Sequence, residues 1–228
     1  MRKIVALAAA VASLPSYATA QNLTTPNVTT GFYGEVGVGL SIIDDAKTDP
    51  FSLDVGVGIL AGTMDTKYPS PTGTFGGEVG FATSRWRFGV SWDWMEANID
   101  KAAFSGTISG APINITFADT YLDSVGIETN SAFMIAEGNI YYKFSRPGSA
   151  VEPYIGIGAG AAFIQNASTE LAVSASAGAR FAITRRAYVG ARYRFTYISG
   201  PESDDGIIKY ENVLIHSLSV QLGMYFGS

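Results

Sequence analysis

The single histidine of the chain, His216, is the residue best suited to acid–base chemistry. Ser217 and Ser219 follow it and Glu211 precedes it, a set of residue types that hydrolyses acyl esters when base and nucleophile meet. Successive side chains of a strand point to opposite faces, so both serines lie opposite His216 if this segment is extended. We therefore expect no catalytic site, and we expect His216 to lie close to lipid headgroups.

Two other patterns resemble ligand sites without completing them. The V-G-V-G runs lack the spacing of a dinucleotide or phosphate loop, and they alternate like strand glycines. The acidic loop from Glu202 to Gly206 lacks the full spacing of a calcium loop. With no cysteine there is no thiolate metal site. We expect no cofactor and no bound metal.

The stretch A-Y-V-G-A-R-Y-R-F-T-Y, from Ala187 to Tyr197, shows how the rest of the chain is organised. One parity is apolar and ends in Tyr193, Phe195 and Tyr197, whereas the other is small and polar and carries Arg192 and Arg194. Only a period of two separates the residues in this way, so the stretch is an amphipathic strand. In a membrane barrel the apolar parity meets lipid and the arginines point into the lumen.

The same alternation recurs along the chain and predicts an all-β, eight-stranded antiparallel transmembrane barrel. Connections after the odd-numbered strands are mostly long and those after the even-numbered strands are short, as in outer-membrane barrels. Two further alternating pieces, 54–61 and 112–118, would give a ten-stranded alternative in which long and short connections no longer fall on opposite sides. We therefore assign them to the loops, where they extend the hairpins beyond the membrane or fold over the mouth of the barrel. The expected strands span residues 31–42, 74–82, 85–94, 131–144, 152–163, 171–183, 187–197 and 213–226.

The N-terminal residues predict export. Residues 1–20 combine Arg2 and Lys3, an apolar core and a final A-T-A, which is the pattern of a cleaved signal peptide. Its removal takes the net charge from −5 to −7, because those two bases leave with it. We expect a flexible segment over 21–30 and the barrel domain over 31–228. No later apolar run is long enough for a spanning helix, and the acidic balance argues against nucleic acid as a partner.

Four motifs carry a family resemblance: G-F-Y-G-E-V-G-V-G-L, V-E-P-Y-I-G-I-G-A-G, A-Y-V-G-A-R-Y-R-F and L-S-V-Q-L-G-M-Y-F. With the signal peptide, they resemble the OmpA-like outer-membrane barrels of Gram-negative bacteria, including opacity and Omp25-type surface antigens. The resemblance implies that Phe226, with apolar residues at alternate positions before it, is the signal for the barrel-assembly machinery. Gly227 and Ser228 follow that phenylalanine, which is a departure from the family pattern.

Charged residues of inward parity are expected to form a paired network, because an eight-stranded barrel is filled by side chains and an unpaired charge there is costly. The resemblance implies Glu–Arg ladders at the same positions. The alternative is a gated ion path in which the partners exchange. The expected network contains Glu35, Glu78, Arg87, Asp93, Glu137, Lys143, Arg180, Arg192 and Arg194.

Aromatic residues of the opposite parity are expected to mark the two edges of the membrane. The expected girdle contains Trp86, Trp92, Trp94, Tyr193, Phe195 and Tyr197.

These features predict a non-enzymatic surface protein of the bacterial outer membrane, with a structural, adhesive or antigen-display role through segments 43–73 and 98–129. Its expected partners are outer-membrane lipid and lipopolysaccharide, the barrel-assembly machinery and a host or surface receptor. The alternatives are a narrow pore or small-hydrophobe channel and, less favoured, a lipid A-modifying enzyme.

Overall fold

The computed structural model describes residues 30–54, 56, 58–68, 71–118, 130–144, 149–165, 167–202 and 209–226. The signal peptide expected over 1–20 and nearly all of the segment 21–30 lie outside these residues, as do Ser203 to Gly206 of the acidic loop and Gly227 and Ser228. Among the described residues, no helix has the length and apolar character needed to cross a membrane.

Eight antiparallel strands close into a barrel in the order β1-β13-β12-β11-β10-β9-β6-β5, which confirms the predicted fold. Each expected strand matches one of these within a few residues, apart from an extension of β6. The barrel strands are β1 (Gly31–Ile43), β5 (Thr72–Ala82), β6 (Trp86–Asn98), β9 (Asn130–Lys143), β10 (Val151–Ile164), β11 (Glu170–Ala182), β12 (Ala187–Ile198) and β13 (Val213–Phe226).

The barrel closes where the first strand meets the last. Phe32 lies opposite Phe226, and the register continues along β1 and β13 to Ile43 opposite Ile215. On the other side of β1, Gly31 lies opposite Ala82 of β5. Closure leaves no open sheet edge in lipid, where an unpaired backbone group would cost several kcal/mol.

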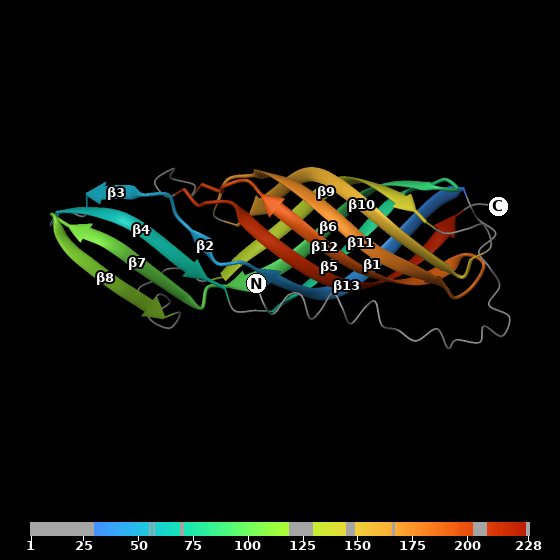
Figure 1. The fold of residues 1–228 in the computed structure, drawn as a ribbon, viewed down its shortest axis with the longest axis horizontal. Coiled ribbons are helices and arrows are strands. Elements are labelled where there is room, and N and C mark those ends of the chain that lie inside the picture. Colours follow the sequence, from blue (N-terminus) through green and yellow to red (C-terminus); the bar gives the residue numbers. More distant parts are fainter. Residues whose placement is uncertain are drawn as a thin grey trace.

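A second, five-stranded sheet stands outside the barrel, and the ten-stranded alternative is wrong. It comprises β2 (Ala46–Lys47), β3 (Phe51–Asp54), β4 (Ile59–Lys67), β7 (Lys101–Ile108) and β8 (Ala111–Ala118). The sheet extends from the end of the barrel opposite the short turns (Figure 1). The alternating piece 112–118 falls within β8. The piece 54–61 covers only the end of β3 and the start of β4, and the longer strand, β4, continues to Lys67.

The inward parity of the barrel strands divides the lumen into three layers. At the short-turn end lie the buried residues Tyr33, Ala82, Tyr188 and Tyr225. Charged side chains fill the middle. At the other end an apolar layer is buried, with Tyr68, Ile164 and Tyr210 packed against it. Its members are Ile43, Ala46, Met95, Ala97, Phe133, Ile135, Ala162, Ala172, Ile198, Val213 and Ile215.

Candidate functional site

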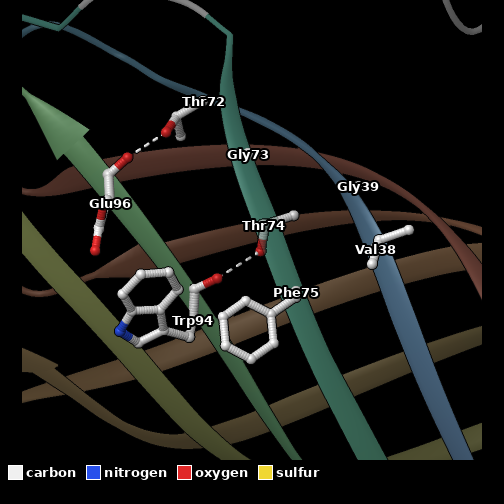
Figure 2. Close-up of a pocket in the computed structure, with 8 residues that line it drawn as sticks. All are labelled: Val38, Gly39, Thr72, Gly73, Thr74, Phe75, Trp94 and Glu96. Atoms are coloured by element: carbon white, nitrogen blue, oxygen red, sulfur yellow. Dashed lines mark hydrogen bonds between the residues drawn. The ribbon is translucent and has the colours of Figure 1, made fainter.

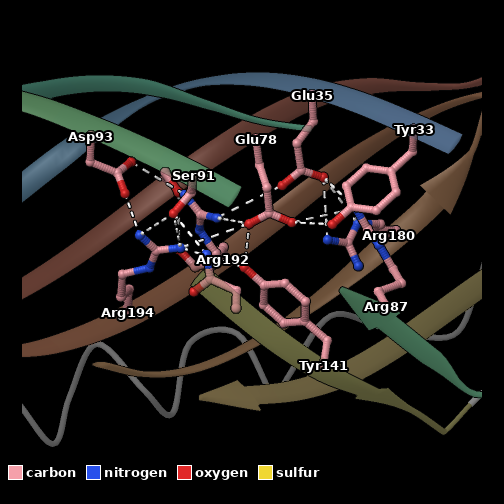
Figure 3. A network of polar contacts seen from close by, with 12 residues as sticks. Tyr33, Glu35, Glu78, Arg87, Ser91, Asp93, Tyr141, Arg180, Arg192 and Arg194 are labelled. Atoms are coloured by element: carbon pink, nitrogen blue, oxygen red, sulfur yellow. Dashed lines mark hydrogen bonds and ion pairs between the residues drawn. The ribbon is translucent and has the colours of Figure 1, made fainter. Parts of the chain in front are cut away.

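The middle of the lumen brings together eight of the nine charged residues of the expected network, seven of which are labelled in Figure 3. The ninth, Lys143, joins the network only through Glu152. The nine residues reach the lumen from β1, β5, β6, β9, β11 and β12, because the closed sheet points one parity of each strand inward. Eight of them are almost completely buried, and Asp93 is half-buried. Charges this far from water are stable only when they are paired.

Glu35 is the centre of the half of the network nearer the short turns. Its carboxylate accepts hydrogen bonds from Arg87 and Arg180, both at 3.2 Å, and from the hydroxyl of Tyr188 at 2.7 Å. Arg192 lies 3.8 Å from its other oxygen. One carboxylate from β1 therefore holds three cations from three other strands.

Glu78 lies beside it and is held largely by phenols. The hydroxyl of Tyr33 donates to it at 2.5 Å, and the hydroxyl of Tyr141 donates to its other oxygen. Arg192 lies 3.6 Å and Arg87 3.9 Å from this carboxylate. The two glutamates thus share two arginines, which joins them into one network.

A second group continues the network towards the apolar layer. Arg194 forms ion pairs with Asp93 and, at 3.3 Å, with Glu137. Ser174 donates to Glu137 at 2.8 Å, and Arg192 reaches Asp93 at 3.4 Å. Arg192 therefore links the two halves, and Arg194 does so as well, since it lies 4.0 Å from Glu78.

Glu152 completes the charge balance, and the sequence reasoning missed it. Lys143 lies 3.2 Å and Arg180 3.7 Å from its carboxylate. With Glu152 included, five acids face five bases. The signal was present in the sequence, because Glu152 has the same parity as the inward residue Tyr154.

Buried tyrosines stack on the arginines and were also missed as members of the site. The guanidinium of Arg87 lies 3.6 Å from the ring centre of Tyr33, and that of Arg180 lies 4.1 Å from the ring centre of Tyr154. A cation over an aromatic face gains about 0.5–2 kcal/mol, more when water is excluded. The tyrosines therefore act as both hydrogen-bond donors and π-partners of the network.

The outer end of the lumen is covered by loop residues. Thr48 and Tyr210 form a β-bridge, and the backbone N–H of Asp49 donates to the carbonyl of Lys209. Burial raises the pKa of both Tyr68 and Tyr210 above that of a free phenol. A hydrogen bond from Lys209 to Glu202, at 2.7 Å, raises the lysine pKa. These contacts join the first and last outer loops over the apolar layer.

His216 lies on the outer wall, where its ring packs against those of Tyr193 and Phe195. The hydroxyl of Tyr193 lies 2.7 Å from its Nδ1, and a carboxylate oxygen of Asp44 lies 3.9 Å from its Nε2. Ser217 faces the other way and its hydroxyl is hydrogen-bonded to that of Ser41 at 2.7 Å. Among the described residues, the side-chain contacts of His216 are thus with Tyr193, Asp44 and Phe195, and none of these is a serine.

The aromatic residues expected in the girdle lie on the lipid-facing parity. Trp86 and Trp92 are exposed, and Trp94 is half-buried because its ring packs 5.0 Å from that of Phe75. Tyr193 is exposed, and Phe195 and Tyr197 are half-buried. The two ends of the outer wall therefore both carry aromatic side chains.

A hollow of about 550 Å³ opens in the outer wall beside Trp94 (Figure 2). Val38 and Phe75 line its apolar part, while Thr72 donates to the carbonyl of Glu96 at its polar edge. Glu96 is the one titratable side chain among the lining residues. The hollow opens on the outer wall, and its lining residues include no pair of groups suited to acid–base chemistry. Nor does the described part of the chain contain a group of three or more His, Cys, Asp or Glu residues placed to hold a metal ion.

Comparisons with known proteins agree with this architecture. The family model for the outer membrane protein beta-barrel domain matches residues 4–226. Neisserial surface protein A has a similar solved structure, with a TM-score of 0.54 and 15% sequence identity, covering 86% of this chain and 97% of that one. OprG of Pseudomonas aeruginosa gives a TM-score of 0.48 at 12% identity, covering 87% and 97%. No curated protein matches the sequence.

Proposed function

The chain belongs to the outer membrane protein beta-barrel family, and we propose that it is a closed member that displays its outer loops rather than a transporter. Its role is structural or adhesive, in the bacterial outer membrane. Export by a signal peptide over residues 1–20 and assembly through Phe226, which lies opposite Phe32 at the closing seam, are parts of this proposal.

The observation that carries the proposal is the filled lumen. Arg87, Glu78 and Glu137 are almost completely buried within the charge network. Above them Phe133, and below them Tyr188, are buried as well. An ion would have to break several ion pairs and cross an apolar layer, each at a cost of several kcal/mol.

The outer sheet provides the surface for the proposed display role. Strands β3, β4, β7 and β8 take no part in closing the barrel, yet they are hydrogen-bonded into an ordered sheet that projects from it. Loops carried by a rigid scaffold are common sites of binding. We therefore place contacts with lipopolysaccharide and with a host or surface receptor on segments 43–73 and 98–129. Residues 119–129 of the second segment lie outside the described residues.

Conductance tests this proposal directly. The full chain, purified and inserted into planar lipid bilayers, is expected to give no stable channel steps. A matched variant, Phe133→Ala, opens the apolar layer while keeping the charge network, and it is expected to stay closed too. Large, regular conductance from the unaltered protein would refute the closed-barrel proposal.

A narrow gated pore is the second candidate, and Arg192 is the observation that favours it. Its guanidinium lies 3.8, 3.6 and 3.4 Å from Glu35, Glu78 and Asp93, so it has alternative partners close at hand. A voltage-dependent current that disappears in Arg192→Met, while the fold survives, would favour the pore.

We do not favour enzyme activity, because His216 is bonded to Tyr193 on the outer wall. Release of acyl groups from lipid A, lost in His216→Ala, would contradict that view.

A further inference from the structure

The hairpin of β7 and β8 forms the far end of the outer sheet. Its turn is Ser109–Gly110, and both residues have positive φ, 47° and 85°. Two-residue turns of this kind match the twist of the flanking strands and fix their register. Ile108 therefore lies opposite Ala111, and Lys101 lies opposite Ala118.

Strand β8 is an edge of the sheet. Of the described strands it pairs only with β7, whereas β7 is paired on both sides by β4 and β8. An edge strand presents a row of backbone N–H and C=O groups to which another strand can pair.

The turn decides which backbone groups point outward. A β-turn closes with a hydrogen bond between its first and fourth residues, here Ile108 and Ala111, and bonded and non-bonded pairs then alternate along an antiparallel ladder. Ile113 and Ile115 consequently bond to β7. The backbone groups of Asn114 and Thr116 point to the open edge. Pro112 has the same outward parity but lacks an N–H.

This edge has little of the usual protection against pairing. Natural edge strands are commonly blocked by charges, especially lysine, or by proline. Residues 102–118 contain no Asp, Glu, Lys or Arg, although the chain as a whole is acidic, and Pro112 is the one proline in that range. Asn114, Ile115 and Thr116 are all exposed. The open part of β8 is thus uncharged and accessible.

One face of the sheet is apolar up to this edge. Cross-strand pairs place Leu60 beside Ile108, Met64 beside Phe104, and Phe104 beside Ile115. Phe51 packs on the ring of Phe104 at 5.9 Å between centres. A strand added at β8 would extend this apolar face, which side chains facing one another across the new pair would stabilise.

We propose that β8 pairs antiparallel with β8 of a second copy of this chain, carried by an apposed membrane. The pairing is centred on Ile115, which lies opposite itself, and Asn114 of each copy lies opposite Thr116 of the other. This register uses every outward N–H between Pro112 and Ala118. It also joins the two apolar faces into one.

A second copy fits because the contact is self-complementary. A strand paired antiparallel with itself gives a two-fold symmetric interface, in which each residue meets the same chemistry. Two acidic proteins repel one another where their charges approach, and residues 102–118 form a protruding stretch without charged side chains, so no like charges meet there.

The direction of β8 places the second copy on another membrane. β8 runs obliquely along the long axis of the molecule, beyond the barrel (Figure 1). Copies in one membrane differ by rotation about the membrane normal, which keeps the same direction of β8 along that normal. An antiparallel pair therefore needs two membranes that face each other.

The β8–β8 contact is small, so we expect its strength to come from many copies that bind at the same time. A stable interface buries about 1,200–2,000 Å², more than one strand pair supplies. Many copies on two facing surfaces gain avidity without new contacts. We therefore expect a monomer in dilute detergent and clustering between protein-bearing vesicles.

The test uses disulfide trapping, since the native chain contains no cysteine. The full chain carrying Ile115→Cys is reconstituted in two vesicle populations with different tags, which are mixed and oxidised. Facing Cβ atoms at the centre of the pair lie within disulfide range, so we expect about tenfold more mixed-tag dimer than for the neighbouring Asn114→Cys. Equal trapping for the two variants would overturn the register, and same-vesicle dimers alone would overturn the apposed arrangement.

Blocking variants provide the second readout. Asn114→Pro removes an outward N–H without touching the ladder with β7, and Thr116→Lys adds a charge at the edge. Both are expected to abolish vesicle clustering, whereas Ser105→Lys, on the doubly paired β7, leaves it intact. Unchanged clustering in both edge variants would refute the proposal. The inference rests on the proposed display of the outer sheet. The vesicle assay depends neither on cellular location nor on conductance, so the β8 pairing and the closed-barrel proposal can fail separately.

Discussion

Replacing Glu35 by glutamine should destabilise the barrel more than any other conservative change in the lumen. The substitution keeps the size of the side chain and removes one negative charge. Arg87 and Arg180 each lie 3.2 Å from that carboxylate, and Arg192 lies 3.8 Å away. Five acids opposite five bases become four opposite five, and one guanidinium is left without a counter-charge in a buried site.

The magnitude follows from these distances. With an effective dielectric constant of about 20, one pair at 3.2 Å attracts by about 5 kcal/mol. Part of that attraction offsets the desolvation of the ions, and removing one partner of a buried pair costs about 3–5 kcal/mol. At about 1–3 kcal/mol per molar urea, this lowers the unfolding midpoint by about 1 M or more.

Urea unfolding of the barrel in detergent, followed by tryptophan fluorescence, measures the effect. Glu152→Gln is the matched control, because Glu152 is partly exposed and should cost less. The double variant Glu35→Gln/Arg87→Met restores the charge balance, so its loss should be smaller than the sum of the two single losses. A midpoint unchanged in Glu35→Gln, or strict additivity in the double variant, would refute the idea of a coupled network.

Three other predictions concern the apolar layer, the outer loops and assembly. Phe133→Ala removes a ring that is 2% exposed and should cost about 3–5 kcal/mol in the same urea assay, so a loss below 1 kcal/mol would speak against a tightly packed layer. Because burial raises the pKa of Tyr210, its contribution to stability is complete below pH about 10 and is lost as pH rises through the raised pKa. A spectroscopic phenol titration against Tyr210→Phe checks this, and ionisation at the pH of a free phenol would contradict it. Phe226→Ala should leave less folded, heat-modifiable barrel in the outer membrane, and an unchanged yield would remove Phe226 from the assembly signal.

The barrel strands were predictable because lipid imposes a strict pattern. Each lipid-facing position must be apolar and each inward position is free to be polar, so a period of two persists for ten residues or more. The outer sheet has no such constraint. In β4, Met64 and Asp65 are both half-buried, since the sheet stands in water with one layer only. Its alternation is too weak to separate from loop sequence, and β7 was missed for the same reason.

The charge network was predictable by parity, but its partners were not. Parity assigns Arg87 and Glu35 to the lumen without saying that β6 and β1 bring them together. Arg87 also bonds to Tyr188, which lies 101 residues away on the opposite wall. Such contacts depend on the tilt and closure of the barrel, which no local pattern contains. The tyrosines were overlooked because a phenol reveals its role only once its arginine is known.

The three layers of the lumen, with the charge network between the tyrosine layer and the apolar layer, favour the outer sheet over the lumen as the functional part of the molecule. The apolar layer beneath Tyr210 and the tyrosine layer at the other end flank the charge network, in which Arg194 is buried and Asp93 is half-buried. On the closed-barrel proposal, a lumen covered in this way contributes stability and offers no path to a solute. The outer sheet is the opposite case, since it contributes nothing to closure and still pairs five strands into an ordered surface. A single-layered sheet with an open edge is marginal in water, and a partner strand at β8 would stabilise it.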